Sequence, residues 1–169
     1  DGQLPSNNKA GYVIRRILRR AVRYQYQYLG FKEPFLNELV PLLAGQFKGV
    51  FDELWNQKDF VQKVVLEEES AFLRTLGNGI SLFDNYIATQ WSDLNSGKNL
   101  EIKDGEPYPI VNEISGQFAF ELSDTYGFPI DLTELMARER SFVVDMAGYQ
   151  AALQQQKTRS RAATAIDTG

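Results

Sequence analysis

Apolar and polar positions along this chain follow the period of helices, with short polar segments between them. Apolar residues recur at spacings of three or four over 11–24, 34–43, 47–76 and 80–88, as in helices that bury one face. Pro34 suits a first helical turn, whereas Pro41 predicts a kink inside the second helix. The run Gly77-Asn78-Gly79 predicts a bend or an end of the third helix. The first half of the chain is therefore predicted to be a helical bundle.

The second half begins with a polar connector that leaves room for a short β-hairpin across 100–111. Its turn-forming residues include Ser96, Gly97, Asp104, Gly105, Pro107 and Pro109. Helices are then predicted over 115–122, 131–140 and 145–163, and Asp131 with Glu134 has the spacing of a capping box. We expect an all-α, multihelical fold of two small bundles. The first covers 1–91 and contains the basic helix, the connector covers 92–112, and the second bundle covers 113–169.

Composition narrows the class of protein. The 169 residues are 43% apolar and 24% charged, which suffices for a buried core. The absence of cysteine and histidine excludes disulfides, zinc sites of the Cys/His kind, thiolate nucleophiles and the commonest general base. No apolar run reaches the ~20 residues of a membrane span. We expect a cytoplasmic protein without a membrane partner and, since the sequence starts without methionine, a piece of a longer polypeptide.

The helix predicted over 11–24 carries its basic residues on one side. At about 100° per residue, five arginines fall within an arc of about 140° and aliphatic residues fill the other half. We expect the aliphatic side to face inward and the arginines outward. The net charge of the chain is −4, yet 9–23 holds Lys9, five arginines and no acid. Because like charges repel and arginine suits phosphate, we favour a nucleic-acid backbone as partner; internal pairing with Glu67, Glu68 and Glu69 is the alternative.

Three stretches in order resemble the alanyl-tRNA synthetase family, in the region that follows its catalytic core. The first comprises D-G at 1–2, P-S-N at 5–7 and G-Y-V-I-R-R-I-L-R-R-A-V-R at 11–23. The most specific is F-E-L-S-D-T-Y-G-F-P-I-D-L-T at 120–133. A weaker one comprises Glu67-Glu68-Glu69, Phe72, Arg74-Thr75-Leu76 and Gly79, and Gln155, Arg159 and Arg161 fit as well. One departure is Ala10, where the family usually has an arginine; Lys9 stands one position earlier.

The resemblance implies a helical tRNA-recognition region without catalytic residues of its own. The family joins alanine to its tRNA with ATP. The catalytic and editing domains, with the ATP, Mg and Zn of the parent enzyme, would lie outside this stretch, so we expect no cofactor and no metal here. The implied partners are the tRNA(Ala) acceptor stem and the catalytic and editing domains of the same longer chain. The family's two readers of a G·U wobble pair match Asn7 and Asp124. RNA backbone contacts are expected from Lys9, Arg15, Arg16, Arg19, Arg20 and Arg23.

The chemistry of Asn7 and Asp124 suits this role. A wobble pair leaves the guanine amine unpaired in the wide minor groove of RNA, where a carboxylate accepts from it and an asparagine amide both donates and accepts. Structural alternatives stay open: Asn7 as a helix N-cap, and Asp124 as a cap of the turn that Gly127 and Pro129 shape. Two other functions are weighed, a helical protein–protein docking scaffold without RNA contact and an independent enzyme. No nucleophile–base pair supports the enzyme.

Overall fold

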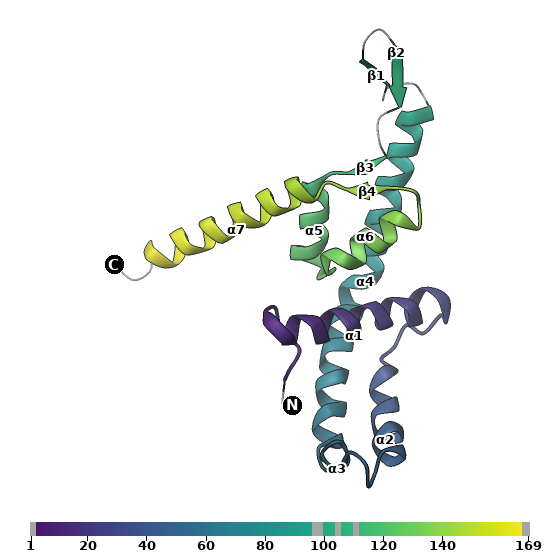
Figure 1. Ribbon diagram of the computed structural model, residues 1–169, viewed down its shortest axis with the longest axis vertical. Coiled ribbons are helices and arrows are strands. Elements are labelled where there is room, and N and C mark those ends of the chain that lie inside the picture. The colour runs from purple at the N-terminus through teal and green to yellow at the C-terminus, as the bar shows by residue number, and fades with distance from the viewer. Residues whose placement is uncertain (1–2, 96–99, 104–105, 110–111, 167–169) are drawn as a thin grey trace. The chain divides into compact units, whose positions relative to one another are not determined.

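The computed structural model describes residues 3–95, 100–103, 106–109 and 112–166, and it confirms the predicted all-α, multihelical class. The helices, shown in Figure 1, are α1 (Lys9–Tyr28), α2 (Leu36–Gln46), α3 (Asp52–Asn56), α4 (Lys58–Asn95), α5 (Gly116–Tyr126), α6 (Ile130–Arg138) and α7 (Met146–Ile166). The chain forms two compact units, Asp1–Gly77 and Asn78–Gly169. The segments predicted from the sequence, 1–91, 92–112 and 113–169, remain a prediction. Of these, 1–2, 96–99, 104–105, 110–111 and 167–169 lie outside the described residues.

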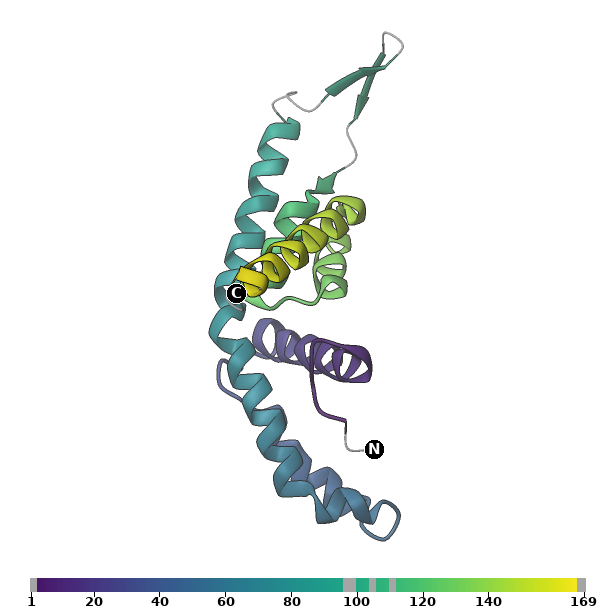
Figure 2. The same ribbon diagram turned by 90° about the vertical axis from the view of Figure 1, so that its left-hand side faces the viewer.

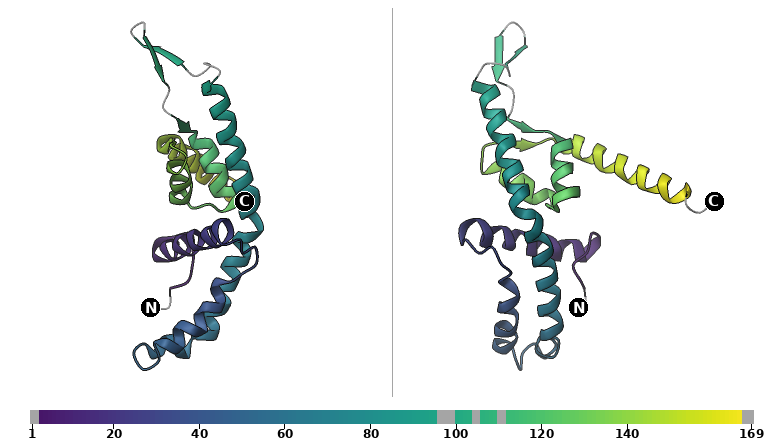
Figure 3. Two further views of the ribbon diagram at one scale, coloured as in Figure 1. Left: turned by 90° about the vertical axis from the view of Figure 1, so that its right-hand side faces the viewer. Right: turned by 180° about the vertical axis from the view of Figure 1, so that it is seen from behind.

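In the first unit, α2 runs alongside the first half of α4, and α1 lies across them (Figures 1 and 3). The core is built from apolar residues at helical spacing, and its buried members are Val22, Val40, Ala44, Phe72 and Leu76. The sequence predicted one helix over 47–76. The structure instead ends the short α3 at Asn56 and begins α4 at Lys58. Pro41 lies inside α2, as predicted.

A buried carboxylate closes the start of α2. The Glu69 side chain comes from α4 and is fully buried. Its Oε1 accepts hydrogen bonds from the backbone N–H groups of Phe35 at 2.6 Å and Leu36 at 3.0 Å, and its Oε2 accepts from the N–H of Asn37 at 3.3 Å. Gln25 of α1 donates to Oε1 at 2.7 Å. Because these N–H groups have no partner inside the helix, Glu69 acts as the N-terminal cap of α2 and ties three helices together.

Helix α4 passes through Gly77-Asn78-Gly79 without ending, so of the two predicted alternatives, a bend or an end, the end is wrong. The two glycines make room for aromatic rings. A Cβ atom on Gly77 would lie 2.6 Å from the Tyr26 hydroxyl oxygen, and one on Gly79 would lie 2.4 Å from the Phe128 ring. These approaches are closer than a side chain allows, so the glycines serve packing within each unit rather than helix termination.

In the second unit, α5 packs against α6 and against the first turns of α7, which then runs clear of both (Figures 1 and 2). The large apolar side chains that are fully buried are Phe83, Ile114, Leu122, Phe128, Leu132, Met136 and Phe142. A two-residue parallel ladder joins β3 (Glu113–Ile114) to β4 (Val143–Val144), which the sequence did not predict. This ladder leads directly into α5 and α7. The Ser115 side chain then caps α5 by accepting from the Phe118 N–H at 3.2 Å.

The predicted connector carries an antiparallel hairpin, as expected from its turn residues. Strand β1 (Leu100–Lys103) pairs with β2 (Glu106–Pro109). The register sets Leu100 opposite Pro109 and Lys103 opposite Glu106. The loop residues 104–105 and the flanking 110–111 lie outside the described residues.

Candidate nucleic-acid interface

The loop that carries Asn7 folds back onto the first turn of α1. The Ser6 N–H donates to the Gly11 carbonyl at 3.0 Å, and the Ser6 hydroxyl donates to the Asn8 carbonyl at 2.9 Å. A Cβ atom on Gly11 would lie 2.3 Å from the Leu4 carbonyl oxygen, so only glycine lets the loop lie this close. Asn8 is the N-cap residue of α1 by its backbone, without a capping hydrogen bond from its side chain. Asn7 is therefore not the N-cap, and that structural explanation of Asn7 is removed.

Arg15 connects this loop to α4. Its Nε donates to Glu68 Oε2 at 3.0 Å and its Nη2 donates to Glu68 Oε1 at 2.5 Å. These two bonds form a bidentate ion pair. Its Nη1 donates to Oδ1 of the exposed Asn7 at 2.5 Å, and its Nη2 lies 3.5 Å from the Pro5 carbonyl oxygen. Arg15 and Glu68 are 19% and 15% exposed, so their pair is partly shielded from water. Internal pairing, the alternative drawn from the sequence, thus holds for Arg15.

Arg19 is also paired inside the first unit. Its Nη2 lies 3.6 Å from Glu68 Oε2, and its guanidinium stands 5.1 Å from the centre of the Phe72 ring. Burial lowers the pKa of Arg19 and the neighbouring positive charge of Arg15 lowers it further, while Glu68 opposes both effects. Glu68 therefore forms ion pairs with two arginines of α1, Arg15 and Arg19.

The orientation predicted for α1, with aliphatic residues inward and arginines outward, is wrong for part of the helix, although Val22 is buried and Arg20 is exposed as predicted. Arg23 is fully buried, donates from Nε to Gln27 Oε1 at 2.5 Å and lies over the rings of Tyr24 and Tyr28. By contrast, Val13 is 43% exposed and Ile17 is 63% exposed. The physical reason is that Glu68, from α4, supplies negative charge to Arg15 and Arg19, which therefore turn toward the protein.

The remaining basic residues of α1 lie nearer the solvent. Lys9 and Arg20 are exposed, and Arg16 is half-buried. Lys9 also has a positive φ of 50° at the start of the helix, a backbone conformation that residues with side chains seldom adopt. Lys9, Arg16 and Arg20 are therefore the part of the predicted basic set with the best access to an external phosphate.

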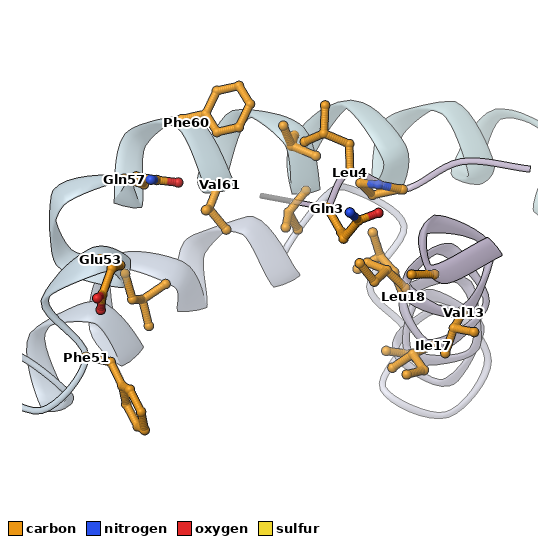
Figure 4. A pocket seen from close by; sticks show the side chains of 17 residues that line it. Gln3, Leu4, Val13, Ile17, Leu18, Phe51, Glu53, Gln57, Phe60 and Val61 are labelled. Atoms are coloured by element: carbon orange, nitrogen blue, oxygen red, sulfur yellow. The ribbon is translucent and has the colours of Figure 1, made fainter. Parts of the chain in front are cut away.

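The outward aliphatic side of α1 lines an apolar groove in the first unit. The groove has a volume of about 1190 Å³. Figure 4 shows Ile17 and Leu18 on the α1 side, Val61 on the α4 side, and Leu4 between them. The other apolar residues that line it are Pro5, Ala10, Val13, Ile14, Ala21, Phe51, Leu54, Phe60, Val64 and Val65.

Asp124 lies in the second unit, exposed in the last turn of α5. The helix is closed by Gly127, whose φ of 71° is left-handed, and the Phe128 N–H donates to the Leu122 carbonyl at 3.0 Å. In the part of the chain that the structure describes, the Asp124 carboxylate has no hydrogen-bond or ion-pair partner. Asp124 therefore caps nothing, and a negative charge near a helix C-terminus is locally unfavourable.

Asn7 and Asp124 thus belong to separate units, and each is placed by its own unit. What sequence reasoning missed is the role of Glu69, although a signal was present. Glu69 stands on the apolar stripe of α4 formed by Val65, Phe72 and Leu76, where a carboxylate has to be buried and bonded. The pairing of Arg15 with Glu68, 53 residues apart, was among the internal pairings that the sequence left open as the alternative.

The described residues contain neither a metal-binding cluster nor a helix that could span a membrane. Among them, no three His, Cys, Asp or Glu side chains gather so that they could hold a metal ion. None of the described helices is both long and apolar enough to cross a membrane.

Comparison with known proteins identifies the family. The family model of the class II (A) tRNA synthetases matches residues 1–168. The chain is 51% identical over 168 residues to an alanine–tRNA ligase of Cytophaga hutchinsonii. The matched region covers 99% of this chain and 17% of that protein. It is 48% identical over 169 residues to the alanine–tRNA ligase of Christiangramia forsetii and 50% identical to that of Bacteroides fragilis, covering 17% and 18% of those proteins. The chain thus spans less than a fifth of the length of these relatives. It belongs to the class II (A) tRNA synthetase family.

Proposed function

We propose that this chain is the tRNA-recognition region of a cytoplasmic alanine–tRNA ligase, and that it binds the acceptor stem and reads its G·U pair through Asn7 and Asp124. The observation that carries the proposal is the exposure of the Asp124 carboxylate and its lack of a partner among the described residues. The carboxylate lies at a helix end where negative charge is unfavourable. A guanine amine in the RNA minor groove is a donor that such an acceptor would bind.

Within this proposal the basic residues of α1 divide into two groups. Lys9, Arg16 and Arg20 contact phosphates, because they lie at the more accessible edge of the helix. Arg15, Arg19 and Arg23 hold the fold and the Asn7 loop through Glu68, Phe72 and the tyrosines. Phosphate contacts give affinity that does not depend on sequence, and base contacts give specificity. The joining of alanine to tRNA is assigned to other parts of the longer protein.

We expect this chain to bind a hairpin RNA with a G·U pair in its stem more tightly than the same hairpin with G·C. Arg20→Ala should weaken binding to both hairpins equally and reduce the dependence of log affinity on log salt by about one phosphate contact. The measurement is fluorescence anisotropy titration between about 50 and 200 mM salt. Lys63→Ala, which removes one positive charge at an exposed position of α4 outside the groove, is the control. Equal affinity of the unmodified chain for the two hairpins would count against base-pair reading.

A second candidate function, docking of a protein surface, is favoured by the apolar groove. We propose that another part of the longer family protein occupies it, since the relatives are more than five times the length of this chain. Side chains as exposed as Ile17 and Phe51 on two walls of one groove are rare on a surface that faces only water. This docking and RNA binding use different sides of α1 and are compatible.

We expect Ile17→Ser to lower the melting temperature of the longer protein by several degrees, and to leave that of the 169-residue chain nearly unchanged, because the lost contact is with the docked part. Differential scanning calorimetry of both proteins measures this. Leu29→Ser, exposed and outside the groove, is the control. If Ile17→Ser instead only abolishes self-association of the 169-residue chain in sedimentation, the occupant is a second copy and the proposed docking is wrong.

A further inference from the structure

The Arg15 guanidinium contacts two residues at once: one edge binds Glu68, and its remaining nitrogen binds Asn7. Two parallel hydrogen bonds, from Nε at 3.0 Å and Nη2 at 2.5 Å, hold the plane of the guanidinium against the Glu68 carboxylate. A forked contact of this kind sets orientation as well as distance. The remaining nitrogen, Nη1, is then carried to one position, where it meets Asn7 Oδ1 at 2.5 Å.

This arrangement also determines how the Asn7 amide is turned. Arginine carries donors only, so the Asn7 atom that faces Nη1 has to be the carbonyl oxygen. The amide nitrogen points elsewhere and has no hydrogen-bond partner among the described residues. An exposed asparagine on a loop would otherwise sample several rotamers. Here the oxygen is held and the NH₂ group remains available as a donor.

We propose that Arg15 and Glu68 are positioning residues for base-pair reading: they touch no RNA, and they fix the amide of Asn7 in the orientation that binds it. The inference rests on the proposed role of Asn7. Ordering of a side chain on binding costs affinity, and a side chain that is already ordered avoids this cost. The pair is partly buried while Asn7 is exposed, so the support stays in place when RNA is absent.

The test measures G·U over G·C discrimination by this chain with the two hairpins. We expect Glu68→Gln to reduce discrimination about two- to tenfold, from the cost of ordering one side chain, and to leave affinity for the G·C hairpin nearly unchanged. Glu67→Gln is the matched control, because it makes the same charge change at an exposed neighbour. Arg15→Lys keeps the positive charge and removes the fork, so it should lose discrimination as well.

A double-mutant cycle with Asn7→Ala separates the possible outcomes. Positioning predicts that Glu68→Gln causes no further loss once Asn7 is alanine. Two outcomes would overturn the positioning role and leave the proposed function intact. In the first, the losses of discrimination from Asn7→Ala and Glu68→Gln add. In the second, Glu68→Gln and Arg15→Lys both discriminate fully while Asn7→Ala does not. No effect of Asn7→Ala itself would overturn both. Thermal melting of each variant identifies a loss of fold, and Arg15→Lys decides the question if Glu68→Gln unfolds.

Discussion

Replacement of Glu69 by alanine is expected to lower the free energy of unfolding of the first unit by about 3–5 kcal/mol. The fully buried carboxylate accepts from three backbone N–H groups at the start of α2 and from the buried Gln25 amide. Each buried donor left without a partner costs about 1–3 kcal/mol, and alanine fills neither the space nor the bonding. Urea unfolding followed by circular dichroism measures the change.

Two variants make this prediction specific. Glu67→Ala removes an exposed carboxylate two residues earlier on the same helix and should change stability by less than about 0.5 kcal/mol. Glu69→Gln keeps the size and one acceptor oxygen, so its loss should fall between those of the other two. A loss below about 1 kcal/mol for Glu69→Ala would show that water or a neighbouring side chain replaces the cap.

Replacement of Asp124 by alanine is expected to reduce discrimination between the G·U and G·C hairpins by about 5- to 150-fold, the effect of one lost base contact of about 1–3 kcal/mol. The same change should raise stability by a few tenths of a kcal/mol, since it removes a negative charge from the C-terminal turn of α5. A residue whose loss improves the fold and damages specificity is retained for binding, not for structure.

The control for Asp124 is Glu121→Ala, an exposed acid one turn earlier on α5. It removes the same charge from the same helix and should leave discrimination unchanged. Equal losses of affinity for both hairpins in Asp124→Ala would mean that Asp124 acts on the RNA in general and not on the wobble pair. Lower stability in Asp124→Ala would instead assign it a structural role.

Local sequence signals predicted most of the helices. Apolar spacing and turn residues located α1, α2, α5, α6 and α7 within a few residues of their ends, and turn chemistry indicated the hairpin of β1 and β2. The parallel ladder of β3 and β4 could not be predicted, because each strand has two residues and the partners are about 30 positions apart. The glycines of α4 were misjudged because a packing glycine and a helix-ending glycine look alike in sequence.

The candidate site was predictable in its members and not in its arrangement. Periodicity showed that α1 has two faces, but it could not say which face turns inward. That choice depends on Glu68, whose link to Arg15 spans 53 residues. Asn7 and Asp124 came from motifs, whereas the support of Asn7 by Arg15 required the three-dimensional structure.

The cap of α2 has a consequence for the order of events during synthesis. Glu69 follows Gln46, the last residue of α2, by 23 residues, so a ribosome that adds about 5–20 residues per second completes α2 about 1–5 seconds before it adds the cap. A helix of 11 residues is too short to persist alone in water. The nascent α2 segment therefore stays unstructured until α4 emerges, and a chaperone that binds exposed apolar segments has this interval in which to find Val40 and Ala44, which the fold later buries.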